Sequence, residues 1–347
     1  MRPGTRVRTA LLGCSILTVG ALAAFGGVAS SDTSPHHPTP EIRAQLFAKV
    51  APLHPDGGQS PEPIGHHTTV EGPAFGPDGG LYFTDITAPA GEPKVIRLDV
   101  ATKKISKVYT DDTSSYSSLQ FNPANGRMYL TDLHGARIDS MRTDGTDRRT
   151  VVSGKVAGHT IAPDDIAFDR AGHMYVSDMA GTPWQPRGRI LRFDRDGKNA
   201  TTVADNLSAP NGISFDPTYS WLWVSEYGSG RELRLILSAD GRETTDGHVG
   251  MYHGNGTARM DSNAVDASGN VYQCMYGAGK ILVWNSLGDL LTTVKIPQNL
   301  PKSQLLTTNV AIKPGTTDGY LTVGGKNGGY IYRFTAAGKG IRQSNGG

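Results

Sequence analysis

Six polar or acidic residues recur along the chain at nearly equal intervals, and each stands at the start of a segment with strand-like apolar alternation. Their successive spacings are 46, 47, 47, 50 and 47 residues, and they are Glu71, Ser117, Asp164, Asn211, Asp261 and Thr308. A structural repeat of that length would bring all six side chains to equivalent places. Four of them offer carboxylate or carboxamide oxygens, namely Glu71, Asp164, Asn211 and Asp261.

Three carboxylates and a carboxamide that converge in one ring would repel one another unless a cation lay among them. Calcium suits such a set, because it takes six to eight oxygen ligands at about 2.3–2.6 Å and tolerates irregular geometry. Manganese and magnesium are alternatives, whereas zinc would favour His or Cys, which the ring lacks. Taken singly, each residue is better explained as a strand-start cap or a solvated loop acid. It is their shared register that favours a metal site.

A cation in this ring could support ester hydrolysis. It could polarise the carbonyl and stabilise the oxyanion that forms, while a carboxylate at its edge takes a proton from the attacking water. Opening a lactone ring needs both functions. A carboxylate bound directly to a metal has a lowered pKa and is a weak base, so the base must be loosely coordinated or act through a water molecule.

Short strands must position this ring. Each repeat continues from its polar start as an alternating apolar strand, turns, and returns as a second strand; the six copies are residues 71–85, 117–132, 164–178, 211–226, 261–276 and 308–325. A further pair of strands follows. Four short strands in about 47 residues are typical of a propeller blade. We therefore predict an all-β fold, a six-bladed β-propeller of four-stranded antiparallel blades around a central channel, over residues 70–342.

Composition and charge exclude other classes. Glycine and proline, 44 and 21 of 347 residues, disfavour a helical bundle, and the alternating strands exclude a helical solenoid of similar period. The formal charge of +2 includes three arginines in the first thirty residues, so it gives no indication of nucleic-acid binding. We expect a monomer with no nucleic-acid partner.

Residues 1–30 have the pattern of a secretory signal peptide. Arg2, Arg6 and Arg8 precede an apolar run that small residues end at positions 28–30. A retained membrane anchor and a lipidated cysteine are the alternatives. Cleavage predicts a secreted, extracellular protein without a membrane partner.

Residues 31–69 are rich in Pro, His, Ser and Gly and are predicted to form a linker, in which Glu41–Val50 could form one short helix. After cleavage Cys274 would be the only thiol, so we expect no internal disulfide.

Two further sets of residues follow from the repeat. The acid that ends the second strand recurs in four units, as expected of a structural device that binds turn amides: Asp85, Asp132, Asp178 and Glu226. The loops that follow would form the wall of a substrate pocket, with His134, Trp184, Tyr227 and Tyr276 as candidates. A partly aromatic rim suits a small, moderately apolar ligand.

Four motifs in blade order resemble the senescence marker protein/gluconolactonase family, which includes regucalcins and calcium-dependent bacterial lactonases. They are Glu71-Gly72-Pro73, Pro163-Asp164-Asp165, Pro210-Asn211-Gly212 and Asp261. The resemblance covers roughly residues 65–340. It implies a divalent metal held by Glu71, Asn211 and Asp261, with Asp164 in a place where some bacterial lactonases have an acid. It also implies Asp261 as the catalytic base, with Asp164 as the second candidate.

This chain departs from the family pattern at two points. The fifth-blade motif is Met260-Asp261-Ser262 in place of Pro-Asp-Gly, and Ala162 stands where sugar-lactone hydrolysing members have arginine. We therefore expect a metal-dependent lactonase or esterase acting on a small molecule. The alternatives are a hydrolase or synthase of another bond on the same scaffold, and a non-enzymatic, calcium-stabilised binding propeller.

Overall fold

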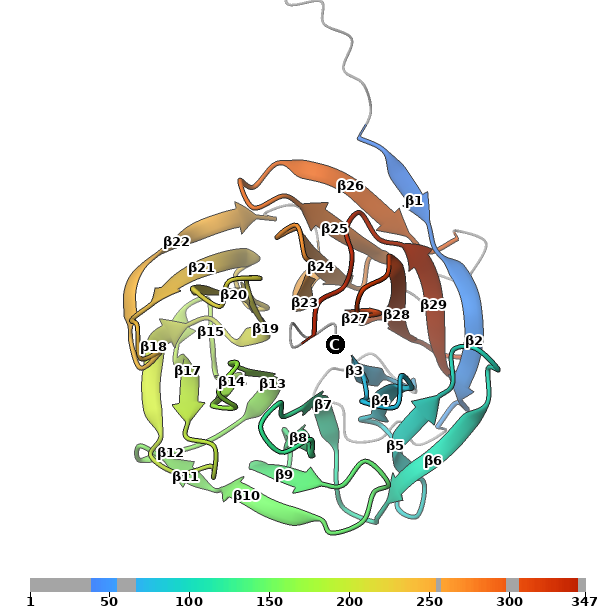
Figure 1. The fold of residues 1–347 in the computed structure, drawn as a ribbon, viewed down its shortest axis with the longest axis horizontal. Coiled ribbons are helices and arrows are strands. Elements are labelled where there is room, and N and C mark those ends of the chain that lie inside the picture. The colour runs from blue at the N-terminus through green and yellow to red at the C-terminus, as the bar shows by residue number, and fades with distance from the viewer. Residues whose placement is uncertain (1–38, 55–66, 254–256, 298–305, 343–347) are drawn as a thin grey trace, which may run out of the picture. The chain divides into compact units, whose positions relative to one another are not determined.

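Strands make up the regular secondary structure that the computed structural model describes, and the described residues are 39–54, 67–253, 257–297 and 306–342. Six sheets are arranged as blades around a central axis, which confirms the predicted all-β, six-bladed β-propeller (Figure 1). Within these ranges no helix is long and apolar enough to span a membrane. The predicted signal peptide lies outside the described residues.

Each of the first five blades is an antiparallel sheet whose first strand lies nearest the axis (Figure 1). Blade 1 contains β3 (Val70–Phe75), β4 (Leu81–Asp85), β5 (Pro93–Leu98) and β6 (Ile105–Thr110). Blade 2 contains β7 (Tyr116–Phe121), β8 (Met128–Asp132), β9 (Arg137–Met141) and β10 (Arg149–Ser153). Blade 3 contains β13 (Pro163–Phe168), β14 (Met174–Asp178), β17 (Gly188–Phe193) and β18 (Thr201–Leu207).

Blade 4 contains β19 (Pro210–Phe215), β20 (Trp221–Glu226), β21 (Arg231–Leu237) and β22 (Thr244–Tyr252). Blade 5 contains β23 (Arg259–Val265), β24 (Val271–Tyr276), β25 (Lys280–Trp284) and β26 (Leu290–Lys295). Two short hairpins form separate two-stranded sheets outside the blades. They are β11 (Lys155–Val156) with β12 (His159–Thr160), and β15 (Gly181–Thr182) with β16 (Gln185–Pro186).

Blade 6 joins the two ends of the described chain. Three of its strands are β27 (Leu306–Ile312), β28 (Asp318–Gly324) and β29 (Gly329–Thr335), and the fourth is the N-terminal β2 (Gln45–Ala51), antiparallel to β29. The neighbouring β1 (Glu41–Arg43) runs parallel to β26 on the outside of blade 5. The two N-terminal strands therefore join different blades: β1 extends blade 5, and β2 completes blade 6 by covering the edge of β29.

The prediction of a short helix at Glu41–Val50 within a linker was wrong. This segment forms β1 and most of β2 instead. Its apolar residues follow one another at every second position from Ile42 to Val50, which is the period of a strand. The unpaired edge of β29 supplies the partner that such a strand needs, and this tertiary pairing could not be read from local composition.

Aromatic pairs fill the interfaces between consecutive blades. A tyrosine in the second strand of one blade packs edge-on against a phenylalanine in the first strand of the next, with centroids 5.0–5.2 Å apart in three cases: Tyr82 with Phe121, Tyr129 with Phe168, and Tyr175 with Phe215. Tyr320 of blade 6 contacts Phe75 of blade 1 in the same way, at 5.6 Å. The recurring phenylalanine of the sequence repeat is thus an inter-blade contact.

The recurring acids bind backbone amides, which lie in the following turn, as predicted, in blades 1 and 2 and just before the first strand in blades 3 and 4. Each accepts a hydrogen bond from a backbone N–H: Asp85 from Thr87, Asp132 from Gly135, Asp178 from Ala162 and Glu226 from Ser208. In blades 2, 3 and 4 the acid also pairs with an arginine of the third strand, namely Arg137, Arg189 and Arg231. In blade 1 the partner is His54, 2.7 Å away, which follows β2.

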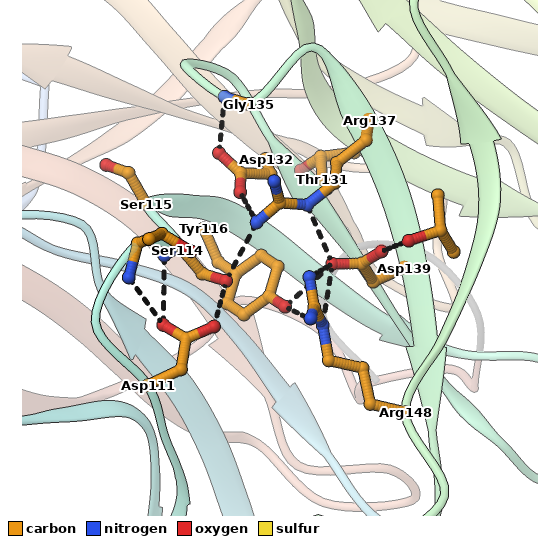
Figure 2. Close-up of polar contacts among 12 residues, drawn as sticks. Asp111, Ser114, Ser115, Tyr116, Thr131, Asp132, Gly135, Arg137, Asp139 and Arg148 are labelled. Carbon is orange, nitrogen blue, oxygen red and sulfur yellow. Dashed lines mark hydrogen bonds and ion pairs between the residues drawn. The ribbon is translucent and has the colours of Figure 1, made fainter. Parts of the chain in front are cut away.

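Figure 2 shows this arrangement in blade 2. The Asp132 carboxylate lies 2.6 Å from the Arg137 guanidinium, and Arg137 also donates to Asp139 at 3.1 Å. Asp139 is fully buried and accepts a second arginine, Arg148, at 2.7 Å. Because two guanidinium groups offset these buried carboxylates, the network is a scaffold of the blade.

Candidate metal centre

The four predicted ligand residues lie at β-bulges in the first strands of their blades. The pairing with the second strand shifts register between Glu71 and Ala74, Pro163 and Ile166, Pro210 and Ile213, and Met260 and Asn263. A bulge redirects side chains and recurs beside functional sites. The first strands of blades 2 and 6 shift register at the same place, so the bulge is a feature of all six blades.

Glycines allow neighbouring blades to approach closely at two of these bulges. Gly72 follows Glu71 with φ +51°, and a Cβ added to it would lie 2.5 Å from a backbone atom of blade 2. Gly212 follows Asn211, and its Cβ would lie 2.5 Å from a backbone atom of blade 5. A side chain at either position would push a ligand-bearing strand away from the first strand of the next blade.

Side-chain hydroxyls of one blade also bind the backbone at the start of the first strand in the next blade. Three of them donate to backbone carbonyls there: Thr131 to Asp164, Ser225 to Asp261, and Thr308 to Val70. The Gln273 amide adds a second donor to the Asp261 carbonyl, at 2.8 Å. The backbone of the ring is therefore fixed by buried side-chain donors.

The two remaining ring positions use their hydroxyls for this purpose. Ser117 donates to the carbonyls of Pro163 and Asp164, at 3.3 Å each, and Thr308 to the carbonyl of Val70 at 2.7 Å. The ring therefore contains four side chains that could bind a metal and two whose hydroxyls bind backbone carbonyls of the next blade.

Burial raises the pKa of all three carboxyl groups, and the charges of nearby acids raise the pKa of Glu71 and Asp261 further. Burial raises the pKa of Asp164 to about 7. Burial, followed by the charges of Asp164 and Asp165, raises the pKa of Asp261, against a hydrogen bond from Asn211 that lowers it. Burial and the charges of Asp261, Asp164 and Asp165 likewise raise the pKa of Glu71. Electrostatically these groups form one cluster.

Three carboxylates of this cluster lie without an ion-pair partner among the described residues. In the described part of the chain, no Lys, Arg or His forms an ion pair with Glu71, Asp164 or Asp261, although Asp164 and Asp261 are only 7% and 5% exposed. Buried carboxylates are usually paired or bound to a metal. The hard oxygen donors therefore fit a divalent cation such as calcium.

The carboxylates are not gathered around a single point in this structure. Among the described residues, no group of three or more His, Cys, Asp or Glu side chains is arranged to hold a metal ion. The Asn211 amide contacts the Met179 sulfur at 3.9 Å, and its oxygen accepts from Ser262 at 3.3 Å. The fold thus gathers oxygen-donor side chains in one ring, but their oxygens do not converge on a common point.

One member of the cluster escaped the sequence analysis. Asp165 is buried and its charge raises the pKa of both Glu71 and Asp261. It follows the ring position directly, so the repeat register did not single it out. The adjacent pair of acids, Asp164-Asp165, was the available signal.

A cavity of about 720 Å³ lies beside Asn211. Its lining includes Met179, which contacts Asn211, and three of the predicted pocket residues, His134, Trp184 and Tyr227. Tyr276 is not among the lining residues, but its ring lies 6.1 Å from that of Tyr227. The structure thus brings three of the four predicted pocket residues to one cavity.

The hairpin β15–β16 forms one wall of the cavity. It carries Trp184 at its tip, between the paired residues Thr182 and Gln185, and 90% of Trp184 is exposed. An exposed indole at the rim of a cavity is available to an apolar ligand.

Known proteins share the sequence pattern and the fold of this chain. Residues 71–309 match the family described as SMP-30/gluconolactonase/LRE-like region. The chain belongs to this family. The matched segment runs from the first predicted ligand, Glu71, to just past the sixth ring position, and so includes all four predicted metal ligands.

Curated relatives are lactonases named drp35. The protein from Staphylococcus epidermidis is 28% identical over 261 residues, which are 71% of this chain and 75% of the relative. The protein from Staphylococcus saprophyticus is 26% identical over 279 residues, 78% of this chain and 84% of the relative.

Solved structures share the fold. A gluconolactonase from Xanthomonas campestris has a TM-score of 0.64 at 20% identity, over 86% of this chain and 99% of that structure. A calcium-binding regucalcin from Agrobacterium tumefaciens has a TM-score of 0.65 at 15% identity, over 88% of this chain and all of that structure. At such identities these likenesses concern the fold.

Proposed function

We propose that this protein is a metal-dependent lactonase that hydrolyses a small lactone or ester. The observation that carries the proposal is the cluster of Glu71, Asp164 and Asp261, of which Asp164 and Asp261 are buried and none pairs with a cationic side chain of the described residues. A cavity of about 720 Å³ lies beside Asn211, the fourth predicted ligand. Membership of the SMP-30/gluconolactonase/LRE-like family and the lactonase names of the curated relatives support it.

Glu71, Asp164, Asn211 and Asp261 would hold the cation, which we propose to be calcium, with manganese and magnesium as alternatives. When bound, the cation would supply Lewis-acid polarisation of the ester carbonyl. The cavity beside Asn211 would receive the lactone and orient its carbonyl toward these residues.

The chain would also provide the base. Asp261 would take a proton from water as the water oxygen attacks the carbonyl carbon. The ring C–O bond then breaks, and the leaving oxygen takes that proton from Asp261, which gives a hydroxy acid. Asp164 is the second candidate for this role. Both carboxyl groups lie in the ring, with Asn211 hydrogen-bonded to Asp261.

A panel of lactones and aryl esters, assayed with calcium and after chelation, tests the proposal. We expect hydrolysis by the calcium-loaded protein and its loss on chelation. Asp261→Asn should abolish turnover while the far-UV spectrum stays that of the wild type. Retained turnover in Asp261→Asn would assign the base to Asp164.

The same panel, extended with phosphotriesters, distinguishes the alternatives. Hydrolysis of phosphotriesters without any lactone turnover would indicate a different bond as substrate. Calcium-dependent stability without turnover of any panel member would indicate a binding propeller. No turnover together with unchanged stability on chelation would contradict both the enzyme and the metal site.

We further propose that the protein is secreted as a monomer after cleavage near residue 30. The arginines and apolar run of residues 1–30 support export. N-terminal sequencing and sedimentation of the protein from the culture medium test both statements; an uncut N-terminus in the membrane fraction would contradict them.

A further inference from the structure

One position of the repeat contributes to the cavity in three consecutive blades. It is the position two residues before the predicted ligand, occupied by Ala162 in blade 3, Ala209 in blade 4 and Arg259 in blade 5. Two of the three are small and leave space above the ring. The third places a guanidinium there, so the cationic group of the wall comes from blade 5.

Arg259 has no anionic partner in the described part of the chain. It forms no ion pair there, and its guanidinium carbon lies 5.9 Å from the centre of the Tyr227 ring, which also lines the cavity. The described residues that line the cavity include neither Asp nor Glu. A guanidinium on an aromatic ring keeps its donor edge free for a planar acceptor.

The rest of the wall is mainly apolar. Leu133, Met179, Pro183 and Trp184 surround the space together with the two alanines, and the other polar lining residues include Thr182 and His134. A ligand with many hydroxyl groups would leave most of them without partners on such a wall. A ligand with an apolar body and one acidic group would match both the wall and its arginine.

We propose that Arg259 binds a carboxylate on the substrate, so that the site selects small lactones with an apolar body and one carboxylate group. This inference rests on the proposed lactonase function and names the substrate class of that same site. Arg259 is a residue of substrate selection: it pairs with the distant carboxylate, while the lactone carbonyl lies at the acidic ring.

Two lactones that differ by one carboxylate test this proposal. The probes are γ-phenyl-γ-butyrolactone and the same lactone with a carboxylate on the para position of its phenyl ring. The measured quantity is the ratio of kcat/KM for the carboxylated lactone to kcat/KM for the neutral one. Wild type, Arg259→Ala and Arg259→Lys are compared, with Arg195→Ala as a charge-matched control at an exposed turn outside the cavity.

We expect Arg259→Ala to lower this ratio about 10- to 100-fold, the range of a lost charge-assisted hydrogen bond, chiefly through KM. Arg259→Lys should retain part of the preference, because it keeps the charge without the planar fork. Arg195→Ala should keep the wild-type ratio. A ratio that is the same in wild type and Arg259→Ala would overturn the proposal while leaving the lactonase function in place.

A binding measurement separates this proposal from the proposed function. Calorimetry with 4-propylbenzoate, which has the carboxylated ring and no lactone, should show binding that weakens about 10-fold or more in Arg259→Ala. If wild type hydrolyses neither lactone but shows this Arg259-dependent binding, the carboxylate site stands and the lactonase function fails. If neither lactone is hydrolysed and binding is equal in both proteins, both are overturned.

Discussion

The hydroxyl of Ser225, at the end of β20 in blade 4, donates a hydrogen bond to the backbone carbonyl of Asp261 in blade 5, at 2.5 Å. The same hydroxyl accepts the backbone N–H of Gly212, the residue after Asn211, at 2.7 Å. One buried side chain therefore links the backbones of two predicted metal ligands that are 50 residues apart in the sequence.

Ser225→Ala should weaken calcium binding beyond its effect on stability. Ser214→Ala is the matched control, because the buried Ser214 also donates to a blade 5 carbonyl, that of Asn263 at 3.0 Å. Each variant should lose about 1 kcal/mol of unfolding free energy. Only Ser225→Ala should show a raised calcium Kd in calorimetry; an equal change in Ser214→Ala would mean that Ser225 has no special link to the ligands.

The pH dependence of stability should reverse its sign when calcium is removed. In the metal-free protein burial raises the pKa of Asp164 from 3.8 to about 7. A raised pKa means that the protonated form is favoured in the folded state, so its stabilising effect is complete below the unfolded pKa and lost as pH rises through the folded pKa. The chelated protein should therefore lose stability between about pH 4 and pH 8.

Calcium requires the carboxylates in their ionised form, so the stabilisation that it confers should grow over the same range of pH. Thermal unfolding at several pH values, with calcium and with a chelator, measures both curves. A Tm difference between the two samples that stays constant or shrinks from pH 5 to pH 8 would contradict this assignment of the carboxyl groups.

Removal of the N-terminal strands should open the propeller. Deletion through Ala51 removes β1 and β2 and exposes the edge of β29, whereas deletion of residues 1–38 leaves both strands in place. The longer deletion should lower Tm by about 10 °C or more and promote aggregation, since an exposed strand edge pairs with other chains. Tm and aggregation can be followed by light scattering during a thermal scan. Equal Tm values and equal scattering of the two deletion variants would show that β2 does not close the propeller.

Asp132→Ala should destabilise the protein without a direct effect on the site. It removes the carboxylate that pairs with the Arg137 guanidinium and accepts from the Gly135 N–H, while Arg137 keeps its hydrogen bond to Asp139 (Figure 2). The expected loss is about 3 kcal/mol of unfolding free energy in urea. Metal affinity should stay at the wild-type value below the unfolding transition, and a large change in affinity would show that this acid does more than support its blade.

The repeat predicted the blades because each of its periodic residues has a repeated physical role. Phe121 and Phe168 recur because each fills the same inter-blade contact, and Asp132 and Glu226 recur because each pairs with the arginine at the start of the third strand. Residues that are equally spaced in the sequence therefore take equivalent positions in successive blades.

Other features depend on contacts that no local pattern carries. The pairing of β2 with β29 joins residues almost 300 positions apart, and the segment was predicted as a helix in a linker. Arg259 lies two positions before a ring residue, where the repeat shows no constant residue type, so only the cavity reveals its role. Asp165 enters the acidic cluster because β13 places it beside the ring.

A calcium titration of the chelated protein, with lactone hydrolysis recorded at each step, tests the central claim most directly. The account predicts that activity is absent without metal and rises in parallel with saturation of one site, and that Glu71→Gln and Asp261→Asn abolish both the binding and the rise. Full activity in the chelated protein, or lactone hydrolysis that does not follow calcium binding, would contradict it.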